Sequence, residues 1–193
     1  MLEEGKSWSG RERHLCYLND GSGRFTDISS LAGVDDPADG RTLAFADWDG
    51  DGDLDLWQAN RTGPRVRFLL NELGENKRFV RFHLVGETCN RDAIGARVVV
   101  VVNGEKRLLR TLRAGEGYLG QSSKVVHIGL PSGVALIEIA VSVHWPGGDV
   151  EAFGSVEPGK TYRMPRPGLQ ANAHELQAPS MPHPRGAPHE LLC

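Results

Sequence analysis

The chain has 193 residues, which is enough for one domain with a hydrophobic core and a short extension. Its formal net charge of −3 argues against a protein that binds nucleic acid through a strongly basic surface. No apolar run approaches the roughly 18 residues of a membrane span, and the first residues lack the apolar stretch of a secretory signal peptide. We therefore expect either a protein that stays inside the cell or a piece of a longer exported chain.

Short strands separated by turn residues are predicted along most of the chain. The 24 glycines indicate many turns, and Asn103-Gly104 suits a tight hairpin because both residues tolerate a positive φ. In chain order, the predicted strands cover residues 15–19, 24–28, 42–46, 54–58, 66–70, 79–85, 96–102, 106–112, 124–130, 134–145, 150–153 and 161–164. One helical turn is expected at residues 28–33. The pattern predicts an all-β fold with a sandwich or barrel-like domain.

The long predicted strand 134–145 shows a clear alternation. One of its faces is uniformly apolar and consists of Ile137, Ile139, Val141, Val143 and Trp145. Because successive side chains of a strand point to opposite sides of the sheet, this face is predicted to lie in the core.

Composition divides the chain into three parts. Residues 1–77 contain the acidic stretch from Asp20 to Asp55, where ten aspartates and two arginines give a local charge of −8. Residues 78–164 are rich in valine and are predicted to form a second β domain. Residues 165–193 hold six of the eleven prolines and no aromatic residue, so we expect a disordered tail or linker.

The acidic stretch ends in a loop with five aspartates in nine residues, D-W-D-G-D-G-D-L-D. Calcium takes six to eight oxygen ligands at about 2.3–2.6 Å, and carboxylates at alternate loop positions are able to surround one such ion. Five uncompensated carboxylates would repel one another, so we predict a Ca²⁺ site. The predicted ligands are the side chains of Asp47, Asp49 and Asp51, the backbone carbonyl of Asp53, and Asp55 either directly or through water.

Other interpretations of this loop fit less well. An EF-hand requires a bidentate glutamate at the twelfth position, where this chain has Gln58, and the flanking residues alternate as in strands. Mg²⁺ is a weaker candidate because it tends to keep its own waters. Asp47 as the nucleophile of a haloacid-dehalogenase-type phosphotransferase would require alternating helices and parallel strands, which the sequence does not predict.

The strand–loop–strand segment resembles an FG-GAP/VCBS repeat, and the second part resembles an ASPIC/UnbV domain. The resemblance rests on residues 18–27 and 44–56 for the repeat, and on residues 90–98, 114–123, 127–130 and 145–148 for the domain. It implies a calcium-binding repeat packed against a second β domain, and an extracellular or periplasmic location. One repeat cannot form a propeller alone, and the family offers no catalytic residues to carry over.

Three further features allow more than one interpretation. Asn90, Arg91 and Asp92 are expected to cap a turn, with Asp92 pairing an arginine such as Arg97, and ligand binding is the alternative. Residues 114–123 are expected to form a tight reversal, or to line a groove with Tyr118 and Gln121. Trp48 is expected to shield the ion or to stack on a neighbouring strand, and an exposed contact residue is the alternative.

Taken together, these features predict a non-enzymatic calcium-binding β module with a structural Ca²⁺ and a protein or glycan partner. A metal-dependent hydrolase or phosphotransferase that uses the acidic loop is one alternative. An accessory interaction domain of a larger protein is another. Cys16 and Cys89 are either free thiols or a disulfide, depending on the compartment.

Overall fold

The computed structural model describes residues 12–72, 78–87, 90–133, 135–166 and 174–176. Within these residues the chain forms thirteen strands and no helix, which confirms the all-β prediction. The strands are β1 (Tyr17–Asn19), β2 (Phe25–Asp27), β3 (Gly40–Ala46), β4 (Asp55–Asn60), β5 (Val66–Leu69), β6 (Phe79–Val85), β7 (Arg97–Val102), β8 (Lys106–Thr111), β9 (Val126–Gly129), β10 (Ile139–His144), β11 (Val150–Ser155), β12 (Lys160–Pro165) and β13 (His174–Leu176).

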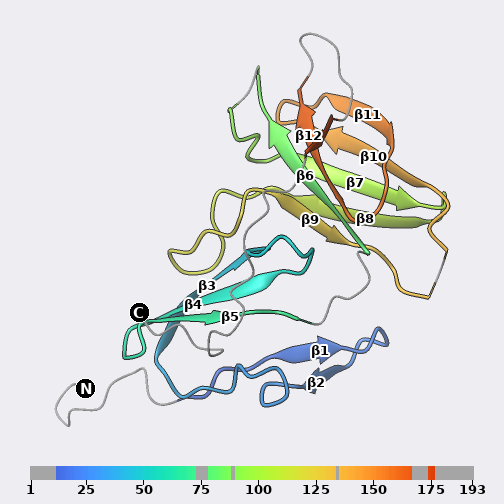
Figure 1. Ribbon diagram of the computed structural model, residues 1–193. Helices are drawn as coiled ribbons and strands as arrows, with labels where there is room; N and C mark the ends of the chain where they lie inside the picture. The colour runs from blue at the N-terminus through green and yellow to red at the C-terminus, as the bar shows by residue number, and fades with distance from the viewer. Residues whose placement is uncertain (1–11, 73–77, 88–89, 134, 167–173, 177–193) are drawn as a thin grey trace.

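Two four-stranded sheets form a sandwich around the hydrophobic core (Figure 1). Sheet I has the strand order β11-β10-β7-β8, and sheet II has the order β13-β12-β6-β9. Within sheet II, β12 runs parallel to β6, whereas β6 and β9 are antiparallel. The alternating apolar residues of β6, β7, β10 and β12 supply much of the core, including Val80, Phe82, Leu84, Val98, Val100, Val102, Val141, Val143, Tyr162 and Met164.

The long strand predicted at residues 134–145 is shorter than expected. Strand β10 begins at Ile139, and Ile137 is 85% exposed, so the prediction that Ile137 lies in the core is wrong. The reason lies in the hairpin at Asn103, whose Oδ1 accepts the backbone N–H groups of Ile137 and Glu138. These N–H groups bind a side chain instead of a neighbouring strand. The other four residues of the predicted face are buried, as expected.

The acidic part of the chain forms a three-stranded sheet of order β3-β4-β5 and a separate hairpin of β1 and β2. Figure 1 shows this sheet between the sandwich and the β1–β2 hairpin. The predicted helical turn is a single turn in which the Ala32 N–H donates to the Ile28 carbonyl at 2.8 Å. At the β7–β8 hairpin, Asn103 and Gly104 both have positive φ, 53° and 73°, as the turn prediction requires.

Part of the predicted tail is described. Residues 174–176 form β13, which pairs with β12, whereas residues 167–173 and 177–193 lie outside the described residues. Cys89, which a bridge to Cys16 would require, also lies outside them. The domain boundaries at residues 77 and 164 stay a prediction.

Candidate metal centre

The acidic loop, residues 47–55, connects the end of β3 to the start of β4. Three of its aspartates, Asp47, Asp49 and Asp55, each place one carboxylate oxygen within 4.8 Å of the others. The chain reverses sharply at Gly50 and Gly52, which have φ of 80° and 106°. L-residues with side chains rarely adopt such values, so these two glycines allow the loop to fold back on itself.

Asp55 is the most buried member of this group and is fully inaccessible to solvent. Its Oδ2 accepts the Trp48 N–H at 2.7 Å and its Oδ1 accepts the Asn71 N–H at 2.9 Å. Burial raises the pKa of Asp55, and the neighbouring charges of Asp49 and Asp53 add to this rise although the two N–H groups oppose it. A buried carboxylate beside other carboxylates is the environment in which a bound cation is most stabilising.

Asp47 is held by an arginine from the sandwich. Its Oδ2 pairs with the Arg81 guanidinium, and the side chains of Asp47 and Arg81 are only 5% and 10% exposed. The other oxygen, Asp47 Oδ1, is buried and has no hydrogen-bond partner among the described residues, and the same holds for Asp53 Oδ2. Buried carboxylate oxygens are rarely left without a partner. The unpartnered Asp47 Oδ1, in a residue that converges with Asp49 and Asp55, therefore fits a hard cation.

The remaining loop aspartates bind the backbone of the loop. Asp49 Oδ1 accepts the Asp51 N–H at 3.2 Å, and Asp51 Oδ1 accepts the Asp53 N–H at 2.8 Å. These bonds hold the two turns of the loop, and burial raises the pKa of Asp51. The structure thus brings Asp47, Asp49 and Asp55 together, whereas the carboxylates of Asp51 and Asp53 lie outside this group.

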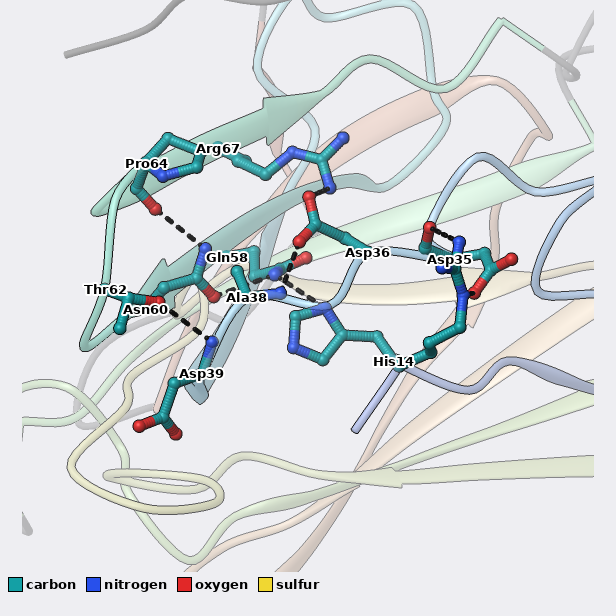
Figure 2. Close-up of polar contacts among 11 residues, drawn as sticks. His14, Asp35, Asp36, Ala38, Asp39, Gln58, Asn60, Thr62, Pro64 and Arg67 are labelled. Atoms are coloured by element: carbon teal, nitrogen blue, oxygen red, sulfur yellow. Dashed lines mark hydrogen bonds and ion pairs between the residues drawn. The ribbon is translucent and has the colours of Figure 1, made fainter. Parts of the chain in front are cut away.

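The other aspartates of the acidic stretch have partners of their own. Figure 2 shows part of this network, in which Arg67 pairs with Asp36 and the Asp36 carboxylate also accepts the Ala38 N–H at 2.6 Å. Asp35 pairs with Arg13, and Asp39 pairs with both Arg41 and Arg61.

The acidic loop lacks such compensation. Its five aspartates have one ion-pair partner among the described residues, Arg81. One arginine against five carboxylates leaves a charge of −4. The local excess of negative charge seen in the sequence is therefore concentrated in this loop.

The loop also packs against the outer face of sheet II. A side chain added at Gly52 would overlap the Phe79 ring, so only glycine fits this contact. His127 Nε2 donates to the Gly52 carbonyl at 2.8 Å, and burial lowers the pKa of His127, which favours the neutral ring. Phe79 stacks on His127 with ring centroids 5.6 Å apart, and the Arg81 guanidinium lies 5.0 Å from the Phe79 centroid.

A second contact joins the edge of β3 to the sandwich. The Phe45 N–H donates to Ser122 Oγ at 3.2 Å, and the Ser123 N–H donates to the Phe45 carbonyl at 2.9 Å. Residues 114–123 make the expected reversal, in which Glu116 and Gly120 pair. Tyr118 lines a cavity of about 610 Å³ beside β3, and Gln121 does not.

Sequence reasoning missed the residues on the sandwich side of these contacts. Phe79, Arg81 and His127 lie on β6 and β9, far from the acidic loop in the sequence. One local signal was present, because Arg81 is a charged residue inside the apolar run from Phe79 to Leu84. A charge in such a position usually has a buried partner.

Three further expectations concern Trp48, Asn90 and Asp92. Trp48 is 52% exposed and lies edge-on to Trp57, with ring centroids 5.3 Å apart, so the stacking prediction is confirmed. Asn90 closes its turn as expected, since its Oδ1 accepts the Ile94 N–H at 2.6 Å. The predicted partner of Asp92 is wrong, because the fold brings Lys124 next to Asp92 from 32 residues away.

Comparison with known proteins confirms the predicted resemblance. Residues 8–57 match the family model of the FG-GAP-like repeat, and residues 86–171 match that of ASPIC and UnbV. Both kinds of segment are typical of β interaction modules in extracellular or periplasmic proteins, and they are generally non-catalytic. Within the described residues, no helix is long and apolar enough to cross a membrane.

Curated relatives include cartilage acidic protein 1 from several vertebrates. The chain is 44% identical to the Mus musculus protein over 57 residues, which is 29% of this chain and 9% of that protein. It is 41% identical to the Xenopus tropicalis protein over 67 residues, which is 34% of this chain and 10% of that protein. The chain thus spans about a tenth of the length of these relatives.

Proposed function

We propose that this chain, in which an FG-GAP-like repeat is followed by an ASPIC and UnbV segment, is a non-enzymatic calcium-binding β module. Asp47, Asp49 and Asp55 would hold the ion through their carboxylates, and Asp51 and Asp53 would complete the oxygen ligands. The observation that carries this proposal is the convergence of three carboxylates within 4.8 Å beside the buried, unpartnered Asp47 Oδ1. When bound, Ca²⁺ would supply the positive charge that the loop lacks.

The ion's role in this proposal is structural. The acidic loop contacts the sandwich through Gly52 and through the pair of Asp47 with Arg81. A cation bound on the other side of Asp47 would fix this loop in the shape that fits Phe79. Calcium would therefore stabilise both the loop and the contact between the repeat and the sandwich.

Calcium suits this site better than magnesium does. All the candidate ligands are oxygens on a loop with two glycines, and Ca²⁺ accepts such flexible arrangements whereas Mg²⁺ demands a near-ideal octahedron. Extracellular calcium modules bind their ion with dissociation constants of about 10⁻⁴–10⁻³ M. An extracellular or periplasmic location, which the family resemblance supports, would supply calcium in this range.

Two observations favour a binding role over catalysis. Asp47, the nucleophile of the alternative phosphotransferase, is buried and paired with Arg81, so a substrate has little access to it. His127, the nearest histidine in contact with the loop, donates its Nε2 proton to the Gly52 carbonyl and is not free to act as a base there. We propose that the exposed loops of the module contact a protein or glycan partner.

The test is thermal unfolding with calcium and with EDTA. Calcium is expected to raise the melting temperature of the wild-type chain but not that of Asp49→Ala, which removes the side-chain oxygens of one ligand. Asp149→Ala, which alters an exposed aspartate of the β10–β11 turn, is the matched control and should keep the full response. Equal melting temperatures of the wild-type chain in calcium and EDTA would overturn the proposal.

A further inference from the structure

The outer face of sheet II carries a second polar site, separate from the acidic loop. At Phe79 and Arg81 this face is buried under the acidic loop, but two residues further along β6 His83 is exposed. A cavity of about 820 Å³ opens there. Its lining combines basic, acidic and apolar side chains, among them His83, Arg91, Asp92, Arg163, Leu84 and Ile94.

Three of these side chains are donors that come from three different segments. His83 on β6 and Arg163 on β12 are direct partners in the parallel pairing of the two strands, so their side chains are neighbours on one face. Arg91 lies in the turn that follows β6. None of the three makes a hydrogen bond or salt bridge with its side chain, as far as the described residues show.

The turn that carries Arg91 is held in place by several bonds. The Gly86 N–H donates to the Arg91 carbonyl at 2.9 Å, and the Ala93 N–H donates to the Asn90 carbonyl at 2.8 Å. The Asn90 side chain binds both backbone groups of Ile94. These bonds hold the backbone of Arg91 at a defined place beside the cavity.

The one carboxylate in the lining is already compensated. Asp92 pairs with Lys124, and this pair lowers the pKa of Asp92, with smaller contributions from Arg91 and His83. Because Lys124 takes the ion pair with Asp92, neither Arg91 nor Arg163 has an ion pair of its own among the described residues. Guanidinium groups bind oxyanions through two parallel hydrogen bonds, which lysine does not match.

We infer that the cavity beside His83, Arg91 and Arg163 binds a tetrahedral oxyanion, a sulfate or phosphate group, carried by a ligand whose apolar part lies on Ile94. Three donor side chains match the several oxygens of such a group better than the two oxygens of a carboxylate. The site is independent of the calcium proposal, since none of its residues belongs to the acidic loop or to the contact with that loop.

The test is calorimetric titration of the full chain with sodium sulfate, sodium phosphate and sodium acetate at constant ionic strength, without added calcium. Saturable binding of sulfate or phosphate is expected, and the ratio of the two affinities shows which of the two groups the cavity prefers. Acetate binding as tight as that of both tetrahedral anions would overturn the assignment, and so would the absence of saturable binding.

Variants connect the binding to the cavity. Arg91→Gln and Arg163→Gln should each weaken binding about tenfold, as expected for the loss of a charge-assisted hydrogen-bond pair. Arg107→Gln, on the exposed edge of β8, is the matched control and should bind as the wild type does. Arg163 lies on a strand surface, so its variant tests the site even where a change in the Arg91 turn disturbs folding. Unchanged binding by Arg163→Gln would refute the inference.

Discussion

The pair of Arg81 and Asp47 provides the sharpest test of how the repeat and the sandwich are joined. Arg81→Met keeps an unbranched side chain about as long as the aliphatic part of arginine but removes the guanidinium group and its charge. The variant leaves Asp47 buried without its partner, and it also removes the bond of 2.8 Å from Arg81 Nε to Thr161 Oγ1. Breaking one side of a buried ion pair typically costs about 3–5 kcal/mol.

This cost sets the expected size of the effect. For a chain of this length, 1 kcal/mol corresponds to a shift in melting temperature of about 2–4 °C, so Arg81→Met should melt roughly 10 °C lower in EDTA. Calcium would compensate the Asp47 charge in place of the guanidinium. The loss should therefore be smaller in calcium than in EDTA.

The assay is urea unfolding followed by tryptophan fluorescence, with a double-mutant cycle. In the cycle, Arg81→Met, Asp47→Asn and the double variant are compared, and a coupling energy well above 1 kcal/mol is expected for contacting residues (about 0.5–3 kcal/mol). Arg107→Met, at an exposed position, is the control for loss of an arginine. A cost of Arg81→Met no larger than that of the control would refute the argument.

Two further outcomes follow from the same loop. Gly52→Ala should lower the free energy of unfolding by about 1–3 kcal/mol, because the new methyl group overlaps the Phe79 ring and because φ at this residue is 106°. The control is Gly129→Ala, where nothing lies within 4 Å of the new methyl group. In chemical denaturation this control should change the free energy of unfolding by less than about 0.5 kcal/mol. Burial raises the pKa values of Asp51 and Asp55 in the folded chain. In EDTA the ionisation of these two carboxyl groups therefore opposes folding. Their contribution to the free energy of unfolding should fall as the pH rises above the ordinary aspartate pKa of about 3.9. Asp51→Asn should flatten this part of the pH profile of stability, and a wild-type profile identical to that of the variant would contradict the assigned cause.

The sequence was sufficient for the features that depend on neighbouring residues. The acidic loop and its flanking strands followed from the spacing of aspartates between alternating residues. The Asn103-Gly104 turn followed from the tolerance of both residues for positive φ, and it is observed. Such features are set by local chemistry, so one segment of sequence contains the information.

Features that depend on distant segments were not predictable in this way. The exposure of Ile137 results from hydrogen bonds to Asn103, and the partner of Asp92 is Lys124 instead of Arg97. The contact of Arg81 with Asp47 joins residues 34 positions apart. Periodicity describes which face of a strand is apolar, but it does not say which segment covers that face.

The acidic loop combines a feature that its sequence predicts with one that its sequence does not predict. The fold brings one carboxylate oxygen each of Asp47, Asp49 and Asp55 within 4.8 Å of the others, while Asp51 uses its carboxylate to accept a backbone N–H. Sequence spacing alone treats all carboxylates at alternate positions as equivalent. The backbone turns at Gly50 and Gly52 decide which of them converge.

Calorimetric titration of the calcium-free chain with CaCl₂ measures the proposed calcium binding itself. We expect one ion to bind per chain with a dissociation constant of about 10⁻⁴–10⁻³ M or tighter, and we expect this binding to be lost in Asp49→Ala and retained in Asp149→Ala. At a calcium concentration 100 times the dissociation constant, such binding stabilises the folded chain by about 2.7 kcal/mol. Absence of a saturable signal in the wild-type chain, or an equal signal in Asp49→Ala, would contradict the proposed calcium site.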